Sequence, residues 1–421
     1  MLALLAIAQG VSATGGGTGT GLGGGGGGAG LSPRHHHARH HRRGDRQARH
    51  HHRRGRRQAT GDANGPLAGQ GMWIWYVSRS GGTAGAIAQR AHAYGIDTVF
   101  IKSSDGSSEW SQFTPQLVRA LHARGINVCA WQFVYGVHPK TEATLGADTK
   151  AEGADCLAID AEAQYEGRYR AASIYMKRLR AIAGRHFPVA LASFPYVDYH
   201  PGLPYSVFLG PGGAQKNAPQ VYWHAIGTSP GQALFHTFVF NRVYGRALVP
   251  LGQTYGNPPL REVRAFRKFA LSYGFKGLSW WSWQETKPAE WRILGSRINR
   301  PVPGFQRTAA YPQLHKGSAG DLVVWAQEHL LGAGEHIKVD GGFGNRTRVA
   351  VEDFQSRRGL PITGTIGPLT WKALLTVRPV AIDWSRPRAK LSKAEAPRGG
   401  EPRSARLPAV RREIPSRPPG D

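Results

Sequence analysis

Short apolar runs recur through residues 71–300, roughly every 25–30 residues, and most are followed by a stretch whose apolar positions have helical spacing. The runs are rich in Val, Ile, Phe, Tyr and Trp, the residue types that strands favour. They read "MWIWYV", "DTVFIK", "INVCAWQF", "CLAID", "FPVALAS", "APQVYW", "ALVPLGQ" and "GLSWWSW". Eight strand–helix units in about 230 residues predict a (β/α)8 TIM barrel, a fold of the α/β class.

The fifth crossover departs from this pattern. Its sequence, "HPGLPYSVFLGPGGAQKNAP", holds too many Pro and Gly residues for a regular helix. A doubly wound open sheet is the alternative fold. The number of strands, and the lack of a G-x-G-x-x-G after the first run, favour the barrel.

A second helical pattern lies within residues 311–376. Apolar residues with helical spacing share the inward face of two successive segments: Val323, Ala326, Leu330, then Val349, Val351 and Phe354. Between them, "DGGFG" predicts a tight turn into the second helix, with Asn345 or Thr347 as its N-cap. The pattern predicts a small all-α domain.

Both ends of the chain lack such periodicity. Gly runs, an Arg/His block and a polar spacer predict a flexible linker, and the basic, Pro-rich C-terminus predicts a disordered tail. We therefore expect five segments: a signal peptide at 1–13, the linker at 14–70, the barrel at 71–300, the all-α domain at 301–376 and the tail at 377–421.

The formal net charge of +27 is concentrated in these ends. Residues 34–57 carry ten Arg against one Asp, and residues 378–421 carry eleven Lys or Arg against five acids. Such tails suit contact with a polyanion such as a wall polymer, phospholipid or nucleic acid. We expect an anionic wall polymer, and nucleic-acid binding by the Arg/His block is the less favoured alternative. The eight His residues of the first block have no defined ligand spacing, so no metal or cofactor is expected.

The first residues, "MLALLAIAQGVSA", form an apolar run that ends in a small-x-small pattern. This indicates a secretory signal, although the usual positive n-region is missing. No other stretch reaches the roughly 18 apolar residues that a membrane span needs. Cys129 and Cys156 lie in strand-like runs, where buried thiols are the expectation and a bridge between neighbouring strands is the alternative.

The carboxyl ends of barrel strands carry the chemistry of this fold, so the residues there are the candidates for a site. They combine aromatic rings with amides and hydroxyls and include few charges, a mixture that suits the C–H faces and hydroxyl groups of sugars. The predicted substrate-binding residues are Lys102, Gln132, Tyr135, Tyr196, Gln253, Tyr255, Trp281 and Trp283.

Asp160 and Glu162 stand two positions apart at the end of the fourth run. On a strand they point to the same side, and like charges that approach raise the pKa of one of them. Glycosidic cleavage uses such a pair, with one group donating a proton and the other stabilising positive charge. The alternative is structural, with Asp160 capping the following helix and Glu162 merely solvated.

"DCLAIDAE", residues 155–162, resembles the D-G-x-D-x-D-x-E signature of family 18 chitinase-type barrels, with Ala158 in place of the middle Asp. The shorter D-x-E also resembles family 25 lysozyme-type barrels, which usually carry an Asp on the first strand that "MWIWYVS" lacks. The chitinase-type resemblance implies that Glu162 is the general acid. Asp160 then orients the N-acetyl group of the substrate, which acts as the nucleophile of a retaining reaction. Tyr222 would hold that acetamide, and Trp281 or Trp283 would floor the sugar site.

Residues 311–376 closely resemble the three-helix peptidoglycan-binding domain. The matching pieces are "LHKGSAGDLV", "VDGGFGNRTRVAVEDFQSRRGL", "TGTIGPLTW" and the terminal "ALL", and one departure is Trp325 in place of the usual Leu. The predicted ligand groove is bordered by Asp340, Phe343, Arg346 and Thr347.

Together these features predict a secreted or envelope-associated monomer that binds peptidoglycan or a related N-acetylated glycan. Its barrel would hydrolyse glycosidic bonds next to N-acetylated sugars. The alternative is a non-catalytic protein whose degenerate barrel only holds glycan.

Overall fold

The structure is a computed structural model that describes residues 65–386. The signal peptide, most of the linker and most of the C-terminal tail lie outside the described residues. The chain divides into two compact units after Tyr311. None of the helices in residues 65–386 combines the length and the apolar character that crossing a membrane requires.

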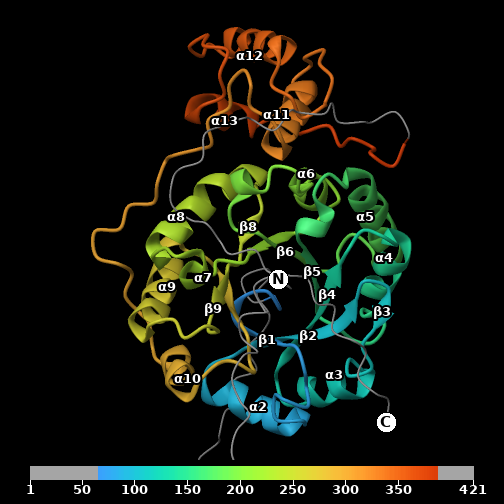
Figure 1. Cartoon of the computed structure of the whole chain (residues 1–421), viewed down its shortest axis with the longest axis vertical. Coiled ribbons are helices and arrows are strands. Elements are labelled where there is room, and N and C mark those ends of the chain that lie inside the picture. Colours follow the sequence, from blue (N-terminus) through green and yellow to red (C-terminus); the bar gives the residue numbers. More distant parts are fainter. Residues whose placement is uncertain (1–64, 387–421) are drawn as a thin grey trace, which may run out of the picture. The chain divides into compact units, whose positions relative to one another are not determined.

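The first unit is built on a parallel sheet whose strands follow one another in chain order (Figure 1). The short strand β3 (Ser108–Glu109) pairs antiparallel with β2 and lies off this path. The parallel strands are β1 (Gly69–Ile74), β2 (Thr98–Asp105), β4 (Asn127–Val134), β5 (Cys156–Ala161), β6 (Val189–Ser193), β7 (Lys216–Pro219), β8 (Ala247–Leu248), β9 (Leu251–Gln253) and β10 (Gly277–Trp281).

The sheet closes on itself through residues 247–253. The first part of this segment, β8, pairs with β7, and its second part, β9, pairs with β10. An isolated parallel bridge between Gln220 and Leu251 joins the two sides. Pro250 lies between β8 and β9 and has no N–H to donate to a sheet, which accounts for the interruption. The predicted (β/α)8 barrel, with one strand split in two, is confirmed.

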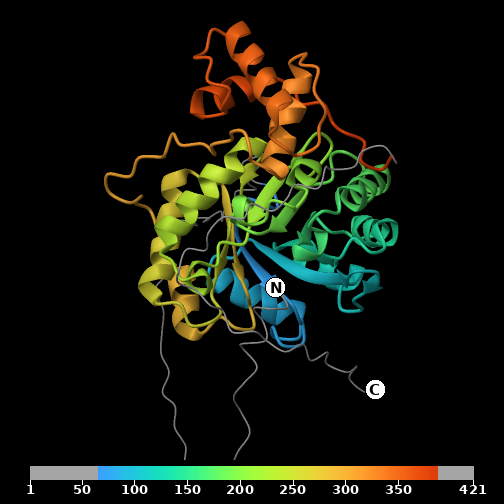
Figure 2. The same ribbon diagram turned by 45° about the horizontal axis from the view of Figure 1, so that its top comes forward.

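Helices flank the strands on the outside of the barrel (Figure 2). The short helix α6 follows β6, where Pro and Gly predicted an irregular crossover, and this prediction is confirmed. The helices are α2 (Ala84–Ala93), α3 (Pro115–His122), α4 (Pro139–Asp148), α5 (Tyr169–Ala183), α6 (Tyr205–Leu209), α7 (Trp223–Ile226), α8 (Pro230–Asn241), α9 (Leu260–Tyr273) and α10 (Pro288–Gly295), with 3-10 turns η1 (Ala163–Tyr165), η2 (Val197–Tyr199) and η3 (Arg242–Tyr244).

The interior of the barrel is filled unevenly. Large rings project from β1, β2, β4 and β10, where Trp73 stacks on Phe100 at 4.8 Å between centroids and Trp131 meets Trp281 edge-on at 4.9 Å. The facing strands β5, β6 and β7 contribute small side chains to the same core: Ala158, Ala190, Ala192 and Ala218. Rings from one half of the barrel therefore occupy the space that alanines leave in the other half.

Cys129 and Cys156 form a disulfide, so the expectation of free buried thiols is wrong. The two residues are direct partners on the neighbouring strands β4 and β5, with their Cα atoms 4.5 Å apart, and both belong to the core of the barrel. The strands were predicted, but their register was not, and the register places the two sulfur atoms together.

Up to residue 386, the second unit contains three helices, as predicted: α11 (Asp321–Gly332), α12 (Asn345–Arg357) and α13 (Pro368–Leu374). Five of the six residues expected to face inward are buried, but Val349 is 44 % exposed, so its assignment is wrong. The predicted caps are also wrong. Gly344 is the N-cap of α12 and makes no side-chain cap, while the Thr347 hydroxyl donates to the carbonyl of Gly342 inside the preceding turn.

We expect the disulfide to stabilise the barrel. Replacing both Cys129 and Cys156 by Ala should lower the free energy of unfolding by about 3 kcal/mol, because the bridge restricts the unfolded chain. Denaturant titration measures this change. Chemical reduction of the wild type should reproduce it, and non-reduced peptide mapping should recover the two cysteines in one linked pair. Recovery of separate free peptides would contradict the assignment.

Candidate functional site

Asp160 and Glu162 lie together at the carboxyl end of the barrel. Asp160 is the last but one residue of β5, Glu162 follows the strand, and each is only 1 % exposed. The side-chain nitrogen of Gln220, just after β7, donates to Asp160 Oδ1 and to Glu162 Oε1, at 2.9 Å in each case. One amide group therefore holds both carboxyl groups, which must face the same point.

This arrangement argues against the structural alternative for the pair. Asp160 lies inside a strand and its partners are Gln220 and Trp131, not the backbone of a following helix. Glu162 occupies the N-cap position of the turn η1 but makes no side-chain cap there, and it is buried rather than solvated. The two carboxyl groups are held close together and away from water. Burying them costs free energy that a solvent-exposed helix cap does not cost.

The environment of Asp160 favours its protonated form. Burial raises the pKa of Asp160 well above its usual value, and the nearby Glu162 raises it further. The indole N–H of Trp131 on β4 donates to Asp160 Oδ2 at 3.0 Å, and the positive charge of Lys102 also favours the ionised form. Burial and the charge of Glu162 together raise the pKa of Asp160 by more than Trp131 and Lys102 lower it.

Lys102 on β2 lies at the same end of the barrel and is 2 % exposed. Its ammonium is 2.9 Å from the Asp105 carboxylate and 4.2 Å from the centre of the Trp131 ring. Burial lowers the pKa of Lys102, and Asp105 opposes that shift. Tyr135, after β4, completes this group, because burial and a hydrogen bond with Asp105 raise the pKa of its hydroxyl.

Glu142 holds the loop that carries Tyr135. Its carboxylate accepts the backbone N–H groups of residues 135–138, at distances between 3.0 and 3.2 Å. Four N–H groups converging on one buried carboxylate make a rigid turn. Tyr135 is thereby fixed beside Asp105.

Rings with unused polar atoms surround the carboxyl pair. Tyr222 and Tyr255 meet edge-on at 5.3 Å, and Trp75 lies 5.9 Å from Trp281. The hydroxyls of both tyrosines and the Trp75 indole N–H are buried and have no hydrogen-bond partner among the described residues. Buried donors without a partner are rare in folded proteins, and a ligand with acceptor groups would satisfy them.

Four of the predicted binding residues do not join this cluster. Gln132 points the opposite way from its neighbour Trp131, donating to the Glu142 carbonyl and accepting from Tyr175 on α5. Trp283 packs edge-on against Trp291 of α10, which leaves Trp281 as the ring at the centre of the barrel. The oxygen of Gln253 accepts from two backbone N–H groups of α7, and Tyr196 stacks on His236 of α8 at 4.0 Å.

The predicted set leaves out four residues of the cluster: Trp75, Asp105, Trp131 and Gln220. Strand alternation in "NVCAWQFV" contains the signal for Trp131, because Cys129, Trp131 and Phe133 share one face, while Gln132 belongs to the other. Choosing the right face requires knowing which side of β4 is the interior. The sequence pattern of this buried strand does not show that, because both faces are apolar.

A glutamine organises the ligand loop expected in the second unit. The side chain of Gln327 on α11 accepts the N–H groups of Asp340 and Gly341 and donates to Asp340, Gly342 and Thr347. A second glutamine, Gln355 on α12, holds residues 363–370 through an equivalent set of bonds. Asp340 and Thr347 are thus bound to Gln327, Phe343 is buried, and Arg346 is exposed at the start of α12.

Residues 319–374 match a family model described as "Putative peptidoglycan binding domain". These residues form a peptidoglycan-binding-type domain. A curated relative, an uncharacterised protein in the bpoA1 3' region of Kitasatospora aureofaciens, is 40 % identical over 65 residues, which cover 15 % of this chain. The chain spans about half the length of that relative, 55 %.

Two solved structures are similar to 54 % of the chain. One is a chitinase from Chromobacterium violaceum, with 10 % identity, 98 % of its chain covered and a TM-score of 0.39. The other is the spore cortex-lytic enzyme SleL of Bacillus cereus, with 10 % identity, 73 % of its chain covered and a TM-score of 0.42. Because both similarities are this low, the evidence for the site comes from the residues of this chain alone.

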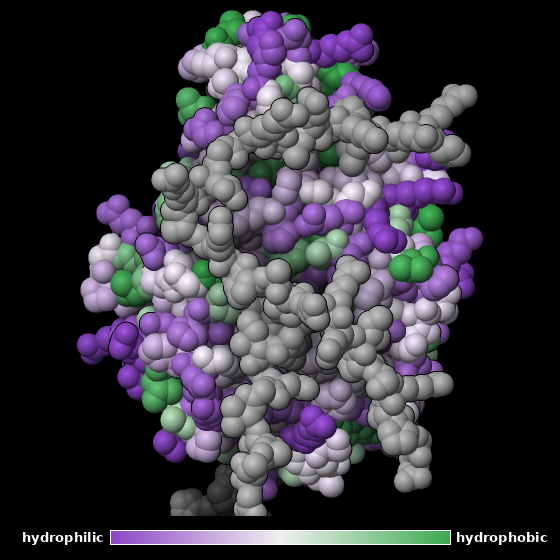
Figure 3. Space-filling view, in the orientation of Figure 1, coloured by the Kyte–Doolittle hydropathy of each residue, from purple (hydrophilic) through white to green (hydrophobic). Residues whose placement is uncertain are grey.

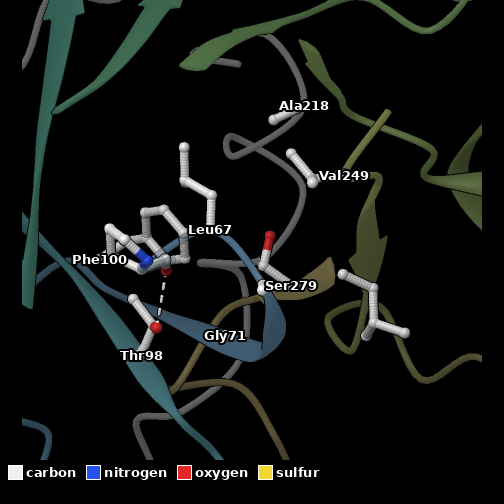
Figure 4. A pocket seen from close by; sticks show the side chains of 10 residues that line it. Leu67, Gly71, Thr98, Phe100, Ala218, Val249 and Ser279 are labelled. Carbon is white, nitrogen blue, oxygen red and sulfur yellow. Dashed lines mark hydrogen bonds between the residues drawn. The ribbon is translucent and has the colours of Figure 1, made fainter. Parts of the chain in front are cut away.

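The described residues also enclose a cavity at the opposite, amino end of the barrel strands (Figure 4). Its volume is 10 Å³, which leaves room for about one water molecule. The lining residues include Leu67, Gly71, Thr98, Phe100, Val249 and Ser279. The cavity is too small for a sugar ring. Within residues 65–386, no group of three or more His, Cys, Asp or Glu side chains is placed to hold a metal ion.

We expect the loss of Gln220 to destabilise the barrel in a pH-dependent way. Gln220→Leu removes the donor shared by two buried carboxyls and should cost about 1–3 kcal/mol of unfolding free energy near pH 7. Because the folded-state pKa of Asp160 is raised, the cost should shrink as the pH falls through that pKa and the pair takes up a proton. Denaturant titrations at several pH values measure it.

Gln132→Leu is the matched control for this change. Gln132 is equally buried, but its partners are a backbone carbonyl and a tyrosine hydroxyl, which do not titrate in the acidic range. Its cost should stay constant with pH. A cost of Gln220→Leu that also stays constant would show that Gln220 contributes only packing.

Proposed function

We propose that this protein binds peptidoglycan and hydrolyses glycosidic bonds next to N-acetylated sugars. The barrel, at residues 71–300, supplies the reaction, and the domain at residues 301–376 holds the wall. The observation that carries the proposal is the carboxyl pair bridged by Gln220 at the carboxyl end of the barrel. This is the end at which TIM-barrel enzymes carry their active sites.

The spacing of the pair supports a retaining reaction. Asp160 Oδ1 and Glu162 Oε1 each lie 2.9 Å from one nitrogen, so they are no more than twice that distance, 5.8 Å, apart. Inverting enzymes leave about 6.5–9.5 Å between their carboxyl groups for a water molecule, so the pair in this chain is too close for that mechanism. This bound agrees with retention, in which the acetamide group of the substrate, rather than a second carboxylate, makes the attack.

In the proposed reaction, Glu162 donates a proton to the leaving glycosidic oxygen. The acetamide oxygen of the sugar attacks the anomeric carbon as the bond to the leaving group breaks, and Asp160 accepts the acetamide N–H. Tyr222 donates its unused hydroxyl hydrogen to the acetamide oxygen, and Trp281 supports the ring. Water then attacks the anomeric carbon and returns a proton to Glu162, which completes the hydrolysis with retention.

The proposed cellular location rests on peptidoglycan as the partner. The peptidoglycan-binding-type domain supports a protein of the cell envelope or the secreted fraction, and the Cys129–Cys156 disulfide is typical of proteins outside the reducing cytosol. We extend the proposal to the basic ends of the chain, which would contact anionic wall polymers and keep the weakly binding barrel close to its substrate.

A non-catalytic, glycan-binding barrel is the second candidate. Ala158 favours it, because the chitinase-type signature has an Asp at this position. In this chain, position 158 lies beside Trp131 in the strand register, and the indole of Trp131 is the partner of Asp160. The two candidates differ in whether the glycan is cut.

We expect Glu162→Gln to abolish hydrolysis and to preserve wall binding. Without a proton donor, the release of reducing ends from peptidoglycan should fall by about 10²–10⁴-fold. Sedimentation of the full chain with peptidoglycan should be unchanged, because Glu162 lies in the barrel. If the wild type releases no reducing ends from peptidoglycan or chitin, the hydrolytic proposal fails and the binding-only candidate stands.

We expect Arg346→Gln to weaken binding to the wall. Arg346 is exposed beside the turn that Gln327 holds, and its positive charge suits the carboxylates of peptidoglycan stem peptides. The dissociation constant from sedimentation should rise about tenfold, as the loss of one charged hydrogen bond predicts. Arg358→Gln, at the other exposed end of α12, should leave it unchanged. Equal effects of the two variants would indicate attraction by net charge alone.

A further inference from the structure

The aromatic surroundings of Lys102 are unusual for a lysine. Four rings lie within 6 Å of its ammonium: Trp131 at 4.2 Å, Phe133 at 5.4 Å, Trp110 at 5.5 Å and Trp75 at 5.9 Å. A desolvated cation is stabilised by the faces of aromatic rings, most of all by Trp. Asp105 is the only carboxylate within 4 Å of the ammonium among the described residues.

The backbone around Lys102 is held as firmly as its side chain. The amide of Gln112 donates to the carbonyls of Trp75 and of Lys102, at 2.7 and 3.0 Å, and so joins the ends of β1 and β2. Two of the rings around the ammonium, Trp131 and Trp75, also pack against the central Trp281. The ammonium is therefore built into the rim of the barrel.

Trp131 connects this cation to the carboxyl pair. One side chain presents its ring to the Lys102 ammonium and its N–H to Asp160 Oδ2. A cation over the face of an indole withdraws electron density and makes its N–H a stronger donor. From Asp160, the chain of contacts continues through Gln220 to Glu162.

We infer that Lys102 is a positioning residue for the carboxyl pair. It fixes the Trp131 indole so that its N–H meets Asp160, and it supplies the positive charge that allows one buried carboxyl to ionise. This role rests on the proposed function, because it describes how the pair is prepared for the reaction. This role requires no contact between Lys102 and the glycan, unlike the substrate-binding role predicted from the sequence.

Several other charged or titratable groups lie around the carboxyl pair of Asp160 and Glu162. Glu162 directly follows β5, the strand that carries Asp160. Tyr222 comes from the loop after β7, and Lys102 and Asp105 come from β2. Tyr135, after β4, also interacts electrostatically with Asp160, and Tyr255, after β9, interacts with Glu162. Glu285, after β10, interacts with the two tyrosines Tyr222 and Tyr255. Lys102 is the only lysine or arginine in this set, so its removal changes the balance of charge at the pair in one direction.

The test follows the Trp131 indole directly. In the full chain labelled with ¹⁵N at its twelve Trp side chains, the indole N–H signal that disappears in Trp131→Phe belongs to this residue. Its chemical shift should change with pH as Asp160 gains or loses a proton. In Lys102→Met the midpoint of that change should move upward by about one pH unit, because the carboxylate has lost a nearby positive charge.

Two variants control the experiment. Lys102→Arg keeps the charge and should keep the midpoint near that of the wild type. Lys140→Met removes one positive charge from the exposed start of α4 and should not move it. The other indole signals report whether each variant is folded. If Lys102→Met is unfolded, the comparison of Lys102→Arg with wild type at low and high salt replaces it. A midpoint that is insensitive to salt then supports a fixed, buried charge.

An unchanged midpoint in folded Lys102→Met would overturn the inference, as would a change confined to KM, which indicates direct contact with the sugar. The signal needs no catalytic turnover. A protein that shows the shift but releases no reducing ends would therefore refute the proposed hydrolysis while leaving the role of Lys102 intact.

Discussion

Two buried carboxyl groups that share one amide are the constraint on which the rest of the barrel rim depends. A buried carboxylate is costly unless hydrogen bonds or a cation compensate for its lost hydration. The inner faces of the strands provide that compensation: Gln220 donates to both groups, Trp131 to Asp160, and Lys102 contributes its charge. This polar cluster thus lies deep inside the barrel, whereas the hydrophilic side chains common on the face seen in Figure 3 have water available.

The uneven filling of the core explains how such a polar group fits inside. Rings from β1, β2, β4 and β10 take up the volume on one side, and the alanines of β5, β6 and β7 leave space on the other. A larger residue at position 158 would compete with Trp131, its neighbour in the strand register, for the interior. The alanine that departs from the chitinase-type signature is therefore also the residue that makes room for the indole.

The sequence predicted the barrel because each strand is a compact apolar run and each break is marked by Gly, Pro or a helical stretch. It placed Asp160, Glu162 and Tyr222 at one rim because strand ends meet there. It failed for Gln132, whose outward direction depends on which face of β4 is the interior, and for Cys129 and Cys156, whose bond depends on register. Val349 was assigned inward because helical spacing alone does not define the width of a buried face.

The partner of Asp160 limits the paths that a proton can take. A carboxyl group at position 158 would be able to exchange a proton with Asp160, but an indole N–H only donates a hydrogen bond and accepts no proton at ordinary pH. Gln220 likewise only donates, through its amide nitrogen, to both acids. Neither Gln220 nor Trp131 can therefore take up a proton from the pair. In the proposed reaction, the charge of Lys102 favours the ionised form of Asp160, which is the form that accepts the acetamide N–H while Glu162 donates the proton.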